Sequence, residues 1–134
     1  MQDRPTAAEL LAEIADALEG DVLHALTGPL QHSVRVAGNL ARIVQRELEL
    51  GPAADAREHA ALSVLLTSTR AEPAQRSKER TIEDLSAEVA ARIRSGDVNF
   101  GREAWPVLVA IAKDKVAIVK PGHDSYDFAD EQDT

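Results

Sequence analysis

Apolar residues recur at spacings of three and four along nearly the whole chain, which is the period of an amphipathic α-helix. The clearest segment runs from Pro29 to Leu50 and carries two neighbouring apolar stripes: Leu30, Val34, Ala37, Ala41, Val44 and Leu48 in the first, and Val36, Leu40 and Ile43 in the second. At about 100° per residue, the two stripes cover roughly half of the helix circumference. A helix that is apolar over this width contacts several neighbours. We therefore predict a central helix at about 30–50, ended by Gly51-Pro52.

Two further helices are predicted on either side of this segment. Thr6 and Glu9 have the spacing of a capping box, in which each side chain binds a free backbone amide of the first turn. The helix that follows should run from about 7 to 26, because its apolar stripe passes through Gly20 without losing phase, although the glycine weakens it. After Gly51-Pro52, a helix is expected over about 55–69.

The second half of the chain predicts two more helices. The segment 70–80 has no apolar period and indicates a solvated connection. Thr81 or Ser77 can cap the next helix, which Gly96 closes. A turn is expected over 97–101. A last helix then begins near Trp105 and stops at Lys120-Pro121-Gly122.

The fold class that follows is all-α. We expect one helical domain over residues 1–122, packed as an irregular bundle of about five helices around the helix at about 30–50. Residues 123–134 are rich in aspartate and glutamate and predict a mobile acidic tail.

Composition narrows the functional classes. The 134 residues include no cysteine, so thiol catalysis and thiolate metal sites are excluded. The formal net charge of −8 argues against nucleic acid or an anionic membrane as the main partner. No apolar run approaches the roughly 20 residues that span a bilayer, and the start of the chain lacks the pattern of an export signal. We expect a cytoplasmic protein.

Two charges fall where apolar residues are expected. Glu47 lies inside the apolar sector of the central helix, and Lys115 lies on the apolar face of the last helical pattern. Because a bare charge in a core costs several kcal/mol, such groups normally find partners. We predict a buried ion pair between Glu47 and Lys115. The alternative is a pocket in which Glu47 is a tuned carboxylate that Lys115 orients.

The remaining candidate residues lie on the polar edge of the central helix. His32, Arg35 and Asn39 follow one another at spacings of three and four, and Arg46 lies on the same polar arc. Such side chains bind carboxylates, phosphates or amides, and equally serve as an ordinary solvated edge. No histidine pair has zinc-site spacing, and no nucleophile is arranged with a base. We expect no metal and no cofactor, and the sequence favours a protein without enzymatic activity.

Several short segments resemble a family of small all-helical bacterial proteins of unknown function. The resemblance lies in the segments at 2–6, 9–11, 35–39, 43–52, 91–96 and 114–116, and its most specific piece runs from Asn39 to Gly51-Pro52. Members of that family are often encoded beside acyl-CoA dehydrogenases and kinases resembling aminoglycoside phosphotransferases. The resemblance implies an accessory role near such enzymes and implies no catalytic residues.

Three functional hypotheses remain. The preferred one is a non-catalytic accessory or interaction protein that serves a kinase-like or acyl-CoA-metabolising enzyme. The alternative is a small-molecule binding or catalytic domain with a polar pocket around Asn39, Glu47 and Lys115. Self-association as a homodimer through helices is the third.

Overall fold

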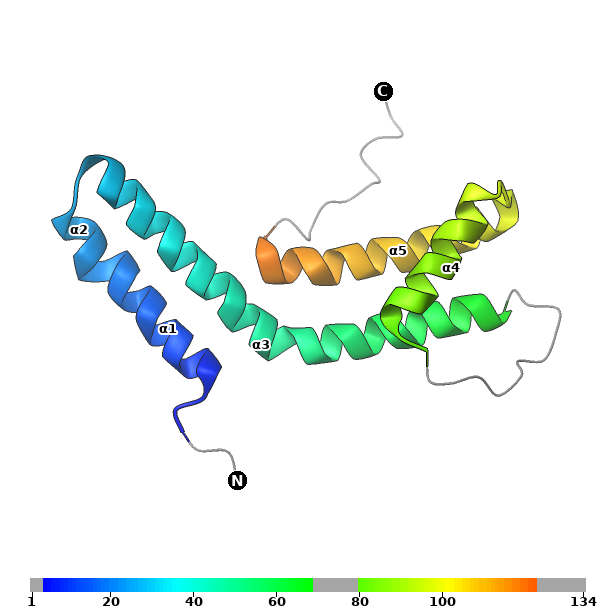
Figure 1. Ribbon diagram of the computed structural model, residues 1–134, viewed down its shortest axis with the longest axis horizontal. Helices are drawn as coiled ribbons and strands as arrows, with labels where there is room; N and C mark the ends of the chain where they lie inside the picture. The colour runs from blue at the N-terminus through cyan, green and yellow to red at the C-terminus, as the bar shows by residue number, and fades with distance from the viewer. Residues whose placement is uncertain (1–3, 69–79, 123–134) are drawn as a thin grey trace. The chain divides into compact units, whose positions relative to one another are not determined.

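A computed structural model describes residues 4–68 and 80–122, and all regular structure within these ranges is helical (Figure 1). The all-α prediction is confirmed. The described residues form four helices rather than five, counting the consecutive segments over 7–25 as one helix, because the two helices expected on either side of Gly51-Pro52 are one. The acidic tail and Ser77 lie outside the described residues.

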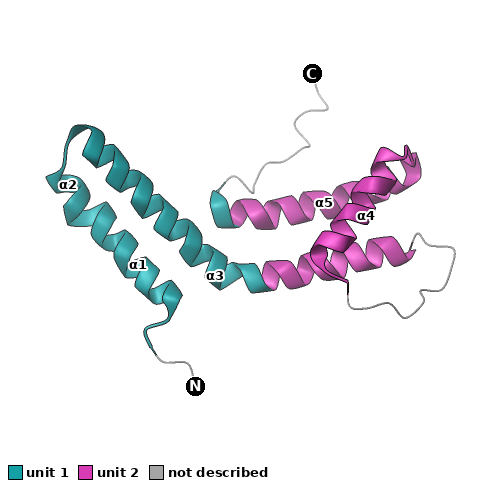
Figure 2. Ribbon diagram, in the orientation of Figure 1, with its two compact units in different colours: residues 1–52, 118–122 teal, residues 53–117, 123–134 magenta. Residues whose placement is uncertain are grey.

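Contacts within the chain separate it into two compact units, shown in different colours in Figure 2. Unit 1 comprises residues 1–52 and 118–122, and unit 2 comprises residues 53–117 and 123–134. The boundaries fall inside two helices, directly after Pro52 and directly before Ile118.

Unit 1 begins with the predicted capping box. Thr6 Oγ1 accepts a hydrogen bond from the Glu9 amide at 3.2 Å, and the Glu9 carboxylate accepts one from the Thr6 amide at 2.7 Å. The helix that follows is α1 (Ala7–Ala17), which passes through a π-helical turn, η1 (Leu18–Val22), into the short α2 (Leu23–Ala25). Gly20 has non-helical backbone angles inside this turn, so the predicted weak point is confirmed.

The long helix α3 (Gly28–Ser68) turns back along α1. Leu26 is extended and Gly28 has a φ of +66°, a conformation that glycine adopts without steric cost. The predicted stop at Gly51-Pro52 is wrong, because α3 continues through Pro52. Proline removes one backbone hydrogen bond and strains the preceding turn, which weakens a helix without always ending it. Here the weakened turn coincides with the boundary between the units.

Unit 2 contains the second half of α3, then α4 (Ile82–Arg94) and most of α5 (Val98–Val119). Thr81 caps α4 through its hydroxyl, with Asp84 completing a capping box, and Gly96 ends it with a φ of +84°. Residues 98–101, expected as part of a turn, form the first turn of α5, because Asp97 accepts a hydrogen bond from the Phe100 amide at 3.0 Å. The end of α5 before Lys120-Pro121-Gly122 is as predicted.

The largest buried apolar cluster lies in unit 2. It joins α3, α4 and α5 and comprises Leu62, Leu65, Leu66, Leu85, Val89, Phe100 and Ala104. The segment at about 30–50, expected at the centre of the bundle, has most of its large apolar side chains half-exposed. The core of this protein is therefore built on the other half of the same helix.

Candidate functional site

The ion pair predicted for Lys115 is present with a different carboxylate. Lys115 Nζ lies 3.0 Å from Glu58 Oε1, and both residues belong to unit 2. The Glu58 side chain is only 10% exposed, whereas that of Lys115 is 62% exposed. The buried charge is thus Glu58, which lies four residues before the core residue Leu62. A helical-wheel projection of the helix expected over about 55–69 would have placed it on the apolar face.

A second salt bridge between α3 and α5 lies beside the Glu58–Lys115 pair. Arg57 Nε donates to Asp114 Oδ2 at 2.9 Å, one residue before the Glu58–Lys115 pair on both helices. This hydrogen bond and the charge of Asp114 raise the pKa of Arg57. If α3 moved by one residue relative to α5, Arg57 would face Lys115 or Glu58 would face Asp114. The two pairs of opposite charge therefore favour one alignment of the two helices.

Glu47 is not buried, contrary to the prediction. Its side chain lies along α3 beside Gly51, where an added Cβ would come within 3.4 Å of Glu47 Oε1. Within the described residues it makes no ion pair, and it belongs to unit 1. The physical reason is simple: a charge inside an apolar stripe needs a buried partner only if the stripe itself is buried, and this stripe is not.

The polar edge of α3 does not gather into a site. His32, Arg35 and Asn39 are exposed and make no hydrogen bond among the residues that the structure describes. Arg46 donates from Nε to the Ile118 carbonyl at 2.6 Å and from an Nη to the Val119 carbonyl at 3.5 Å. Those carbonyls end α5 and have no partner within their own helix, so Arg46 acts as a C-terminal cap.

Sequence reasoning also missed a clamp that closes the α1–α3 hairpin. The Arg42 guanidinium binds Asp16 and donates to Glu19 Oε2 at 2.9 Å from an Nη and at 3.2 Å from Nε. The hydrogen bond with Glu19, followed by that with Asp16, raises the pKa of Arg42. Beside this clamp Gly38 is buried against Glu19, whose Cγ would lie 3.0 Å from an added Cβ.

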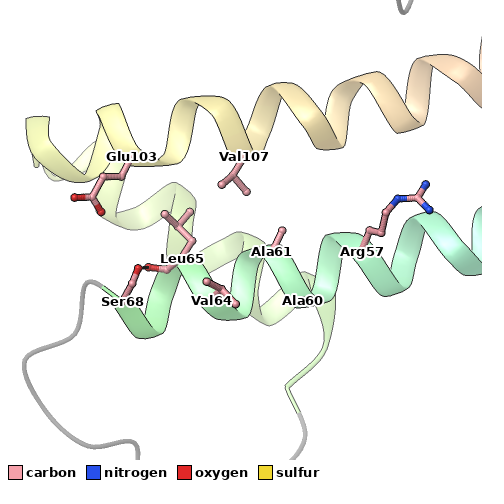
Figure 3. A pocket seen from close by; sticks show the side chains of 8 residues that line it. All are labelled: Arg57, Ala60, Ala61, Val64, Leu65, Ser68, Glu103 and Val107. Carbon is pink, nitrogen blue, oxygen red and sulfur yellow. Dashed lines mark hydrogen bonds between the residues drawn. The ribbon is translucent and has the colours of Figure 1, made fainter.

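An open apolar groove of about 640 Å³ lies in unit 2 between α3 and α5 (Figure 3). Its lining residues are Arg57, Ala60, Ala61, Val64, Leu65, Ser68, Glu103 and Val107. Arg57 is bound to Asp114, and the Ser68 hydroxyl donates to the Leu65 carbonyl at 3.1 Å. The groove holds no nucleophile aligned with a base, so its lining suits contact with apolar groups rather than bond making.

A second apolar surface lies in unit 1, on the first half of α3. Four side chains at successive spacings of four form a ridge, and each is about half-exposed: Val36 43%, Leu40 55%, Val44 47% and Leu48 47%. On the neighbouring α1, Leu10 and Ile14 are 50% and 51% exposed. We call the four α3 residues the apolar ridge. The contacts of Arg42 with Asp16 and Glu19 show which faces of α1 and α3 meet. The helical period then places Leu10 and Ile14 on the same side of the hairpin as the ridge residues Val44 and Leu48.

The described residues contain no group of three or more histidine, aspartate or glutamate side chains that could hold a metal ion. In the same ranges, none of the helices combines the length and the apolar character needed to cross a bilayer.

Comparison with known proteins gives one match. The family model described as a domain of unknown function, DUF6285, matches residues 24–123. No curated protein and no solved structure gave a significant match to the chain. Because the match covers well over half of the sequence, the chain belongs to the DUF6285 family.

Proposed function

We propose that this member of the DUF6285 family is a non-catalytic interaction protein that binds a helix of a partner protein through unit 1. The observation that carries the proposal is the apolar ridge. Its four side chains, from Val36 to Leu48, are exposed on a well-formed helix. Large contiguous patches of exposed apolar surface are uncommon on monomeric proteins and often mark interaction sites.

The dimensions of the ridge suit a helical partner. The twelve-residue interval from Val36 to Leu48 is about 18 Å long at 1.5 Å per residue, a little over three turns. Rows of side chains four residues apart are the ridges that interdigitate when helices pack against one another. Leu10 and Ile14 widen the apolar surface on the α1 side.

The identity of the partner is a proposal that rests on the family resemblance. A kinase resembling aminoglycoside phosphotransferases and an acyl-CoA dehydrogenase are the first two candidates. The chain would then act in the cytoplasm as an accessory subunit of one of these enzymes.

A ligand site around Asn39, Glu47 and Lys115 has less support. Asn39 and Glu47 lie in unit 1 and Lys115 in unit 2. The Lys115 ammonium is already bound to the Glu58 carboxylate. No observation gathers these groups around a common ligand.

The test is capture of the partner from the native host with the tagged full chain, followed by mass spectrometry. Wild type and Leu40→Ser are compared with Val98→Ser, a matched control at an exposed valine in unit 2. We expect one protein to be recovered in stoichiometric amount with wild type and Val98→Ser and to be lost with Leu40→Ser. Recovery that is equal with all three chains, or no enriched protein at all, would contradict the proposal.

A further inference from the structure

The end of the apolar ridge at Val44 and Leu48, together with the neighbouring apolar residues of α1, is bordered by carboxylates. Glu47 lies next to Leu48 and three residues after Val44, on the far edge of the ridge from α1. Glu13 lies next to Ile14 and three residues after Leu10, on the outer edge of α1. The two helices run antiparallel, since Arg42 of α3 contacts Asp16 and Glu19 while Gln31 reaches the Leu23 carbonyl. The apolar surface therefore has an acidic border on each flank.

These two border carboxylates have no partner among the described residues, in contrast to other acids of the same hairpin. Glu9 completes the cap of α1, and Asp16 and Glu19 bind Arg42. Glu13 and Glu47 are exposed and make neither a hydrogen bond nor an ion pair in the part of the chain that the structure describes. Their charges are open to a ligand.

From this arrangement we infer that the ridge takes an amphipathic helix whose apolar stripe is bordered on both sides by lysine or arginine. The inference rests on the proposed function and specifies the chemistry of the partner. Basic side chains beside the stripe would meet Glu47 on one flank and Glu13 on the other. Charges beside an apolar seam set partner choice in helical pairs in the same way.

The same charges disfavour a second copy of this chain as the occupant. Residues 7–25 carry five carboxylates and no lysine or arginine. Pairing two hairpins through α1 and the Val44–Leu48 end of the ridge would bring these carboxylates together, and like charges across an interface oppose association. A partner with basic borders gains attraction at Glu13 and Glu47, where a second copy that pairs through the same surface gains repulsion.

The length of the ridge sets the length of the occupant. A helix that follows the ridge over about 18 Å needs a little over three turns, with apolar anchors at spacings of three and four. Designed peptides of about 18 residues meet this requirement. They can be made with identical apolar stripes and with border positions that are all lysine, all glutamine or all glutamate.

The experiment measures the binding of these three labelled peptides to the full chain by fluorescence anisotropy, at low and at high salt. We expect the lysine peptide to bind at least about tenfold more tightly than the glutamate peptide, with glutamine between them and the difference shrinking in high salt. Glu47→Lys should reduce the preference severalfold. Glu83→Lys, which reverses an exposed carboxylate in unit 2 away from the apolar groove, should leave it unchanged.

Three outcomes overturn the inference: equal binding of the three peptides, a preference that survives Glu47→Lys, or a dimer of the free chain in light scattering that Leu40→Ser abolishes. Its failure is distinguishable from failure of the proposed function. If Leu40→Ser abolishes capture of the native partner while the peptides show no charge preference, the ridge is an interface. Only the inferred basic borders of the partner helix are then wrong. If capture is unaffected by Leu40→Ser, the proposed function itself is wrong.

Discussion

Leu62 and Leu40 lie on the same helix and belong to equally regular apolar stripes, yet the first is 1% exposed and the second 55%. Around Leu62, α4 and α5 supply Leu85, Val89 and Phe100, and the cluster is closed. In unit 1, α1 packs against a different face of α3 from that of Leu40, the face that carries Gly38 and Arg42. The two halves of α3 show that apolar periodicity identifies a face that can be buried, without saying whether the covering surface belongs to the same chain.

Truncating one leucine on each half gives the largest difference. Leu62→Ala removes buried methyl groups and leaves a cavity, so we expect it to lower the free energy of unfolding by about 3 kcal/mol. Leu40→Ala removes groups already half in water and should cost less than about 1 kcal/mol. Urea unfolding followed by circular dichroism measures both values. Losses of similar size in the two variants would show that the ridge is buried in the free chain.

The proline at the boundary between the units offers the next largest effect. Pro52→Ala restores the missing amide donor, and we expect a gain of about 2 kcal/mol, since the cost of proline inside a helix exceeds the entropy it removes from the unfolded chain. Thermal unfolding should move upward and become more cooperative across the two halves of α3. Pro121→Ala, after the end of α5, is the control and should change little. If the Pro52→Ala variant were less stable than wild type, the proline would itself stabilise the folded chain, contrary to this account.

The clamp that closes the hairpin of unit 1 should contribute a smaller amount. Arg42→Ala breaks the contacts with Asp16 and Glu19, which are partly solvated, so we expect a loss of about 1 kcal/mol. Arg35→Ala on the exposed edge is the matched control and should lie within about 0.5 kcal/mol of wild type. Chemical unfolding of the two variants gives the comparison. Equal stabilities for both would show that α1 is held by apolar contacts alone.

The smallest expected effect is on the loss of folding stability at acidic pH. The hydrogen bond from the Phe100 amide, and then that from Arg92, lower the pKa of Asp97 below its ordinary value of 3.8. A carboxyl group whose pKa is lower in the folded state stabilises the fold above its ordinary pKa, and that stabilisation is lost as the pH falls through the lowered value. We expect Asp97→Asn to reduce the loss of melting temperature between about pH 5 and pH 2. An unchanged acid slope in that variant would contradict this account.

Local signals predicted much of the fold from sequence. The capping box at Thr6 and Glu9, the cap at Thr81, the weak point at Gly20 and the end of α5 all depend on interactions within one turn. Such interactions can be predicted from a few neighbouring residues of the sequence. The stop expected at Gly51-Pro52 was wrong, because α3 continues through Pro52 although the proline removes one backbone hydrogen bond.

The candidate site was harder to predict because it depends on contacts between distant segments. Lys115 was identified as needing a carboxylate, but two glutamates of α3, Glu47 and Glu58, both lie at apolar positions. Only the structure distinguishes the two glutamates. The apolar stripe that contains Glu58 is buried, whereas the stripe that contains Glu47 is exposed to solvent. The clamp at Arg42 and the cap at Arg46 were missed because the position of an arginine on the polar face of a helix does not indicate which residue it binds.

If the ridge binds a partner protein as proposed, its exposure has a consequence for the amount of this protein in the cell. Chaperones and proteases recognise apolar surface that stays uncovered, and they remove chains that present it for long. Copies made in excess of the partner would keep the ridge from Val36 to Leu48 open. We therefore expect the steady-state amount of this chain to follow that of its partner, so that an orphan copy is short-lived and assembly itself sets the stoichiometry.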